Sequence, residues 1–215
     1  MSSRNHVVIT GTGRSGTTFL VELLTHIGLE TGFSADDIVS KKFKEARAGL
    51  EYDIRRKDCP FIVKSPCFCD YAEDVICRDD IVIEHVFIPV RDLNAAAESR
   101  RHVLKTNVSN LHFVERLKHM FRPRKFPGGL WHTRSSKPGK QEEILLRQIY
   151  KLMLAISDTT LPVTFIRYPR IVKDCPYLFE KLKPILRDIT YESFCAMFSK
   201  AVRPELVHSF NKNDC

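Results

Sequence analysis

An apolar, β-branched run that breaks into a glycine-rich loop and then into a helix start constrains this chain more than any other feature. Residues 7–9 (Val-Val-Ile) are typical of a buried strand, and residues 10–18 (Thr-Gly-Thr-Gly-Arg-Ser-Gly-Thr-Thr) follow directly. Glycines allow unusual backbone angles and the close approach of an anion, and the unpaired amides of a helix start point at that anion. The segment therefore predicts a phosphate-binding loop at the end of a buried strand.

The loop fits the dinucleotide-binding fingerprint only in part. Residues 11–16 satisfy G-x-G-x-x-G, and Asp36 and Asp37 lie about twenty residues further on, where a ribose-binding acid is expected. In that fold the acid ends a second strand, but residues 28–35 (Gly-Leu-Glu-Thr-Gly-Phe-Ser-Ala) contain no apolar run able to form one.

The triphosphate loop G-x-x-x-x-G-K-[ST] also fits, with one exception. Thr17 occupies the position of the lysine that, with magnesium, neutralises the β- and γ-phosphates. A nucleotide kinase or hydrolase without this lysine needs a substitute cation, and the nearest one is Arg14. This interpretation remains an alternative.

Taken as one unit, Arg14 is a cation followed by a small-residue turn and two hydroxyls at a helix start. This unit resembles the 5′-phosphosulfate loop of the sulfotransferases that use 3′-phosphoadenosine 5′-phosphosulfate, in the form found in bacterial and carbohydrate-modifying members. The resemblance implies that Arg14 stabilises charge on the leaving phosphate. It also implies that the 5′-phosphate is bound by the loop residues Gly13, Arg14, Ser15, Gly16, Thr17 and Thr18.

A second anion site follows a later strand. The donor also carries a 3′-phosphate, and residues 81–88 form a strand-like run that leads into a helix. Arg91 stands at the strand end, and Ser99 lies eight residues on, about two helical turns. The pair resembles the 3′-phosphate motif of the same family, although Leu93 stands where the family often has proline.

Two further positions resemble the family. Lys64 is followed by Ser65 and Pro66, as in the Lys-Ser/Thr/Ala-Pro segment that carbohydrate sulfotransferases keep near the transferred group. Tyr168 follows the last expected strand, where the family often has a tyrosine close to the adenine. Trp131 and Arg134, in a basic Pro/Gly-rich stretch at residues 121–140, are candidates to close over the nucleotide as a loop or lid.

The general base that takes the proton of the acceptor is expected to be a carboxylate. The cytosolic branch of the family uses a histidine two residues after its lysine, but Pro66 occupies that position here. The resemblance to the carbohydrate branch, which uses a carboxylate, makes Asp36 and Asp37 the leading candidates, followed by Glu51 and Asp70.

The spacing of apolar residues predicts an α/β fold, a three-layer P-loop-type parallel sheet flanked by helices, in a single domain over residues 1–215. Residues 31–43 are expected to form an irregular loop. The expected strands lie at 7–9, 60–66, 81–88 and 162–167, and the expected helices at 17–27, 43–56, 71–77, 92–106, 109–120, 141–157, 170–185 and 190–202.

Composition limits the partners. A net charge of +8 suits a polyanionic donor or an acidic acceptor, and it would equally suit nucleic acid, for which no motif is visible.

Seven cysteines with no apolar signal segment indicate a reducing compartment, the cytoplasm, with most of them buried as small hydrophobic side chains. The sequence contains no run of eighteen apolar residues, so no membrane span is expected.

The resemblance thus implies an enzyme that transfers a sulfuryl group from 3′-phosphoadenosine 5′-phosphosulfate to a hydroxyl or amine of an acceptor, with carbohydrates among the candidates. This chemistry requires no metal, since the donor has no terminal polyphosphate to bridge. The alternatives are a P-loop nucleotide kinase or NTPase, and a non-enzymatic basic module that binds nucleic acid or another anionic polymer. The acceptor and the oligomeric state are not predicted.

Overall fold

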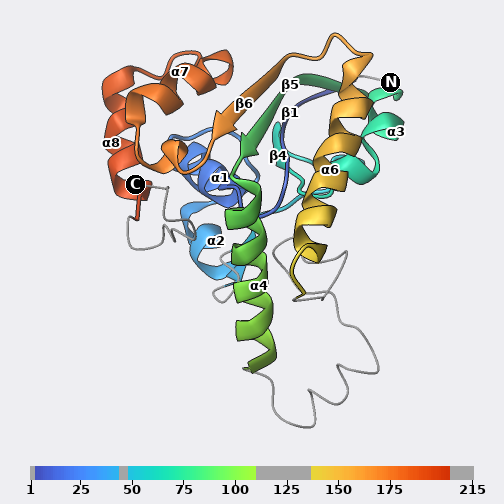
Figure 1. The fold of residues 1–215 in the computed structure, drawn as a ribbon. Helices are drawn as coiled ribbons and strands as arrows, with labels where there is room; N and C mark the ends of the chain where they lie inside the picture. The colour runs from blue at the N-terminus through green and yellow to red at the C-terminus, as the bar shows by residue number, and fades with distance from the viewer. Residues whose placement is uncertain (1–2, 44–47, 110–136, 204–215) are drawn as a thin grey trace.

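Four parallel strands form the centre of the fold, in the order β4-β1-β5-β6 (Figure 1). The structure, a computed structural model, describes residues 3–43, 48–109 and 137–203. Each strand lies where an apolar run predicts one, and their bounds are β1 Arg4–Ile9, β4 Ile62–Lys64, β5 Ile81–Val90 and β6 Val163–Arg167.

Helices cover both faces of the sheet, because alternate side chains of each strand point to opposite sides. Val7 and Ile9 pack with one set of helices and Val8 with the other. The first set is α1 (Thr17–His26), α7 (Cys175–Leu186) and α8 (Tyr191–Ala201), and the second is α3 (Ala72–Ile76) and α6 (Lys140–Ser157) (Figure 1). The predicted three-layer α/β architecture is confirmed.

Helix α4 (Leu93–Ser109) leaves the tip of β5 and extends past the carboxyl ends of the strands (Figure 1). The Asp92 carboxylate accepts a hydrogen bond from the Ala95 amide at 2.9 Å and so supports the first turn. Further along, Arg101 donates to Glu142 of α6 at 2.7 and 2.9 Å and to Glu98 at 2.7 Å. This arginine therefore ties α4 to α6.

The prediction of an irregular loop over residues 31–43 is wrong. Residues Ala35–Ser40 form helix α2, which begins at a reciprocal capping box: the Ser34 hydroxyl accepts from the Asp37 amide, and the Asp37 carboxylate accepts from the Ser34 amide. A Ser-x-x-Asp sequence thus starts a short helix where no apolar periodicity announces one.

The predicted helix over residues 43–56 is also wrong. The short strand β2 (Lys42–Phe43) pairs antiparallel with β3 (Ala48–Gly49). Gly49 and Leu50 then adopt positive φ angles of 120° and 57°, which an α-helix cannot contain.

The predicted helix over residues 170–185 is split in two. Residues Arg170–Val172 form a 3₁₀ helix, η2, and α7 starts afresh because the Asp174 side chain accepts a hydrogen bond from the Tyr177 amide. The helices predicted near 17–27, 71–77, 92–106, 141–157 and 190–202 are confirmed. The helix predicted at 109–120, and Trp131 and Arg134 in the loop predicted at 121–140, fall largely or wholly outside the described residues.

The cysteines differ from expectation. Cys69 is buried, as predicted, but Cys77 is exposed, and Cys175 and Cys195 form a disulfide that joins α7 to α8. No pattern in the sequence indicates this pairing, because the two residues are separated by 20 positions and only the packing of α7 on α8 brings them together. In the part of the chain that is described, none of the helices is long and apolar enough to cross a membrane.

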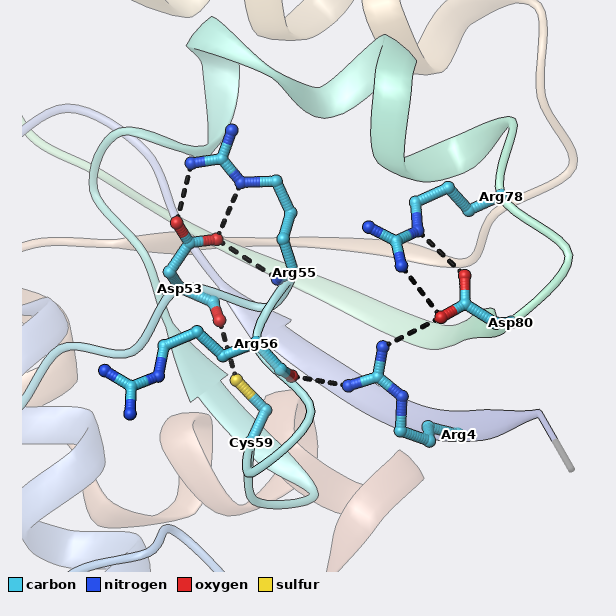
Figure 2. Close-up of polar contacts among 7 residues, drawn as sticks. All are labelled: Arg4, Asp53, Arg55, Arg56, Cys59, Arg78 and Asp80. Carbon is cyan, nitrogen blue, oxygen red and sulfur yellow. Dashed lines mark hydrogen bonds and ion pairs between the residues drawn. The ribbon is translucent and has the colours of Figure 1, made fainter. Parts of the chain in front are cut away.

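Charged side chains pair with one another at the edge of the sheet where the strands begin (Figure 2). Asp80, directly before β5, accepts hydrogen bonds from Arg78 at 2.8 Å and from Arg4 of β1 at 3.1 Å, which lower the pKa of its carboxyl. Cys59 donates to the Asp53 carbonyl at 2.8 Å. The residues drawn in Figure 2 are Arg4, Asp53, Arg55, Arg56, Cys59, Arg78 and Asp80.

Candidate functional site

The loop between β1 and α1 has glycine where its path leaves no room for a side chain. Gly11 has a φ of 123°, and a Cβ there would lie 3.2 Å from the Pro89 carbonyl oxygen of β5. Gly16, the N-cap of α1, has a φ of 93°, and a Cβ there would lie 2.4 Å from Ile171 Cδ1 of η2. The two glycines therefore allow the loop to lie directly against the ends of β5 and β6.

Arg14 occupies the centre of this loop in a left-handed conformation, with a φ of 74°. A residue with a Cβ costs about 1–2 kcal/mol in this region, and such strain is concentrated at ligand sites. The neighbouring Ser15 hydroxyl is buried and donates to the Thr12 carbonyl at 2.6 Å. Ser15 thus holds the turn with its side chain, which leaves its backbone amide as the group it can offer to an anion.

The first turn of α1 offers its backbone amides. The N-cap residue, Gly16, has no side chain to cap this turn, and the turn contains no acidic residue that would compete with an anion. The amides at a helix start carry partial positive charge and have no partner within the helix. Thr17 and Thr18 begin this helix, at the pole that faces the loop.

The two predicted anion-binding segments meet at Arg14. Its Nε donates to the Ser99 hydroxyl of α4 at 3.0 Å, and its carbonyl accepts from Arg91 Nη1 at 3.2 Å. The Arg91 guanidinium lies 4.6 Å from the ring centroid of Tyr168, at the end of β6. Four residues from three predicted segments are thus linked by a chain of contacts, from Ser99 through Arg14 and Arg91 to Tyr168.

Lys64 lies on the other side of the loop, at the end of β4. Its side chain is only 2% exposed, and its Nζ donates to the Thr18 hydroxyl at 3.0 Å, to the Gly49 carbonyl at 2.5 Å and to the Glu51 carboxylate at 3.2 Å. Burial lowers the pKa of Lys64, Glu51 opposes that shift, and the positive charge of Arg14 adds to it. Lys64 is therefore a buried cation close to Arg14.

Neither leading candidate for the base contacts these cations. Asp36 is exposed on α2. Asp37 binds the Ser34 amide and forms an ion pair with Lys41 at 2.7 Å. The Lys41 and Ser34 contacts lower the pKa of Asp37 to about 2, which makes this carboxylate a weak base.

Glu51 is the acid that reaches the site. Its carboxylate is 25% exposed and contacts Lys64, whereas Asp70, the other reserve candidate, is exposed beyond β4. In the sequence, Glu51 stands behind Asp36 and Asp37 as a candidate base, and it lies in a segment where a helix is expected. The pairing of β2 with β3 and the turn that follows bring Glu51 beside the end of β4.

Arg100 is a residue of this region that the motifs do not identify. It stands one position after Ser99, its side chain is 0% exposed, and its Nε donates to the Gln141 side chain of α6 at 2.7 Å. The available signal is its place on the apolar face of α4, three and four residues after Ala97 and Ala96.

Cations from four segments thus gather where the strands end. Among the described residues, no group of three or more histidine, cysteine or acidic side chains could hold a metal ion. Neither the family models nor the curated proteins compared with this chain match it. The structure establishes an α/β protein with a four-stranded parallel sheet, and function must be argued from the site.

Proposed function

We propose that the protein is a sulfotransferase that moves a sulfuryl group from 3′-phosphoadenosine 5′-phosphosulfate to a hydroxyl or amine of an acceptor. The observation that carries the proposal is the contact of Arg14 with both Ser99 and Arg91. A ligand at this junction meets two anion-binding segments at once. A donor with a phosphate on each side of its ribose has the matching arrangement of charge.

The loop and the start of α1 bind the 5′-phosphate, and Arg91 and Ser99 bind the 3′-phosphate. Because Ser99 already accepts a hydrogen bond from Arg14, its hydroxyl proton remains available to a phosphate oxygen. Tyr168 lies against Arg91 and offers a ring face beside which the adenine can pack.

The transfer step forms a bond from the acceptor oxygen or nitrogen to sulfur and breaks the bond from sulfur to the bridging phosphate oxygen. The electron pair of the broken bond stays on the phosphate, where Arg14 stabilises the developing charge. Lys64, buried and bonded to Thr18, holds a second positive charge beside the transferred group.

The acceptor proton goes to Glu51 in this proposal. Its carboxylate lies 3.2 Å from Lys64 Nζ and is partly open to solvent, so that an acceptor can approach it. Asp37 is the weaker candidate, since its carboxylate is held by Lys41 and by the first turn of α2.

Calorimetry with adenosine 3′,5′-bisphosphate and with magnesium-ATP tests the choice of nucleotide. We expect binding of the bisphosphate without magnesium. Magnesium-dependent binding of ATP, with none of the bisphosphate, would refute the proposal in favour of a nucleotide kinase or hydrolase.

A pair of arginine variants tests the role of the second segment. Arg91→Ala should weaken adenosine 3′,5′-bisphosphate by about 10- to 100-fold, the loss of a charge-assisted contact, and adenosine 5′-monophosphate much less. Arg167→Ala is the matched control, because this exposed arginine ends the neighbouring strand β6. Equal losses for both nucleotides in Arg91→Ala would remove Arg91 from its proposed role.

A further inference from the structure

Arg100 presents a buried positive charge that none of the described residues neutralises. Its Nη1 and Nη2 atoms are buried, and none of the described residues accepts a hydrogen bond from them. Its one side-chain partner among these residues is the neutral amide of Gln141, at 2.7 Å. Buried guanidinium groups are normally paired with a carboxylate or fully hydrogen-bonded, so this arrangement is unfavourable for the protein alone.

The guanidinium remains charged at neutral pH. Burial lowers the pKa of Arg100 to about 10, the nearby positive charge of Arg14 acts in the same direction, and Cys67 opposes them. The place of Arg100 in the fold follows from its neighbour Ser99, which accepts a hydrogen bond from Arg14 Nε at 3.0 Å. Arg100 thus stands on the turn of α4 that contacts the loop.

The adjacent residue shows what a structural arginine looks like on this helix. Arg101 is also largely buried, but two glutamates, Glu142 and Glu98, accept its hydrogen bonds at 2.7 to 2.9 Å and raise its pKa. Since Arg101 already ties α4 to α6, the packing of the two helices does not require a second arginine. A neutral side chain such as glutamine also carries a donor that could hydrogen-bond Gln141.

We propose that Arg100 binds an oxyanion, a phosphate or sulfate group, that a ligand brings to the loop, with Nη1 and Nη2 as the donors. The proposal rests on the proposed function only for the ligand that carries this group. A planar guanidinium suits a tetrahedral oxyanion because it can donate two parallel hydrogen bonds. Both donors are covered in this structure, so binding requires that neighbouring side chains shift.

Thermal unfolding of Arg100→Gln, with and without sodium sulfate, tests the proposal independently of enzyme activity. Without sulfate, we expect the Tm of the variant to equal or exceed that of the wild type, because an unneutralised buried charge has been removed. The sulfate-induced rise in Tm should shrink in Arg100→Gln and be partly retained in Arg100→Lys. Arg101→Gln, the control, should show a lower Tm and an undiminished response to sulfate.

Two ligand measurements identify the source of the oxyanion. A rise of about 10- to 100-fold in the Kd of adenosine 3′,5′-bisphosphate in Arg100→Gln would assign Arg100 to a nucleotide phosphate. In the second measurement, the sulfate-induced rise in Tm is recorded at saturating bisphosphate. If Arg100→Gln loses this rise but keeps its affinity for the bisphosphate, Arg100 binds the transferred group or an acidic acceptor.

The opposite pattern overturns the inference: a lower Tm in Arg100→Gln together with unchanged responses to sulfate and to bisphosphate would make Arg100 a structural residue. If Arg100→Gln does not fold, unchanged responses in Arg100→Lys overturn it equally. A wild type that responds to sulfate through Arg100 but does not bind the bisphosphate would support this site while refuting the sulfotransferase proposal.

Discussion

Gly16, at the start of α1, has a positive φ and has no space for a Cβ, and replacing it by alanine tests both features. The residue has a φ of 93°, and its Cα faces Ile171 and Tyr168. Gly28, after the other end of α1, has a nearly equal φ of 86° but has nothing within 4 Å of a Cβ. The two substitutions therefore share the conformational cost, and only the one at position 16 adds a packing conflict.

The magnitudes follow from these neighbours. A Cβ in the left-handed region costs about 1–2 kcal/mol, which is the whole expected effect of Gly28→Ala. In Gly16→Ala the new methyl would lie 2.4 Å from Ile171 Cδ1 and 3.1 Å from Tyr168 Cδ2. Since Ile171 is fully buried, this overpacking adds about 1–3 kcal/mol.

Thermal unfolding of both variants checks the reasoning. For a chain of this length 1 kcal/mol lowers Tm by about 2–4 °C, so we expect a decrease of about 4 °C for Gly28→Ala and about 10 °C for Gly16→Ala. Gly16→Ala should also weaken nucleotide binding, because relief of the conflict moves Tyr168 away from the loop. Equal decreases in Tm would show that Ile171 and Tyr168 do not pack over Gly16 as described.

Three further outcomes are expected. Glu51→Gln should lower kcat by about 100-fold with donor affinity retained, while Asp37→Asn should leave kcat near the wild-type value; the reverse pattern would return the base to α2. Cys195→Ser should lower the free energy of unfolding by about 3 kcal/mol in denaturant titrations, the entropy of a loop of this size, and added reductant should abolish the difference from the wild type. The Asp37 carboxyl should titrate by NMR with a pKa of about 2, below its ordinary value of 3.8. Its contribution to stability is therefore present above about pH 4 and is lost as the pH falls toward 2. Lys41→Ala should raise this pKa, because the Lys41 contact is the largest cause of the shift.

The sheet could be predicted because each strand is a short apolar run bounded by turn residues. Residues that end such a strand are also predictable in position, since parallel strands finish at one edge of their sheet. The resemblance to the sulfotransferases singles out Arg14, Lys64 and Arg91, each at or after the end of an expected strand, and the structure brings them to the same edge.

The segment between α1 and β4 could not be predicted from periodicity. Its helix begins with a capping box of Ser34 and Asp37 and is too short to show an apolar face. Its two short strands pair only with each other, and the turn after them depends on the positive φ of Leu50. The contact of Glu51 with Lys64 could not be predicted for the same reason, because it depends on a turn rather than on a repeating pattern.

Arg100 escapes prediction for a different reason. An arginine among helical residues is normally exposed, and nothing in the motif that contains Ser99 requires the next side chain to be buried. Its burial follows from the packing of α4 against α6, which joins residues 41 positions apart at Arg100 and Gln141. Contacts of this kind become visible only when the helices are placed.

The strand order gives the proposed ligand a direction. Lys64, Arg14 and Arg91 follow β4, β1 and β5, which are neighbours in that order, so the three cations are expected to lie in the same order along the carboxyl edge. With the 5′-phosphate at the central loop and the 3′-phosphate at Arg91, the transferred group must point toward Lys64 and Glu51. Substitutions beside β5 and β6 should therefore change the affinity for nucleotide, whereas substitutions beside β4 should change turnover or the KM of the acceptor. A variant of Glu51 that weakened only the nucleotide would show that this direction is reversed.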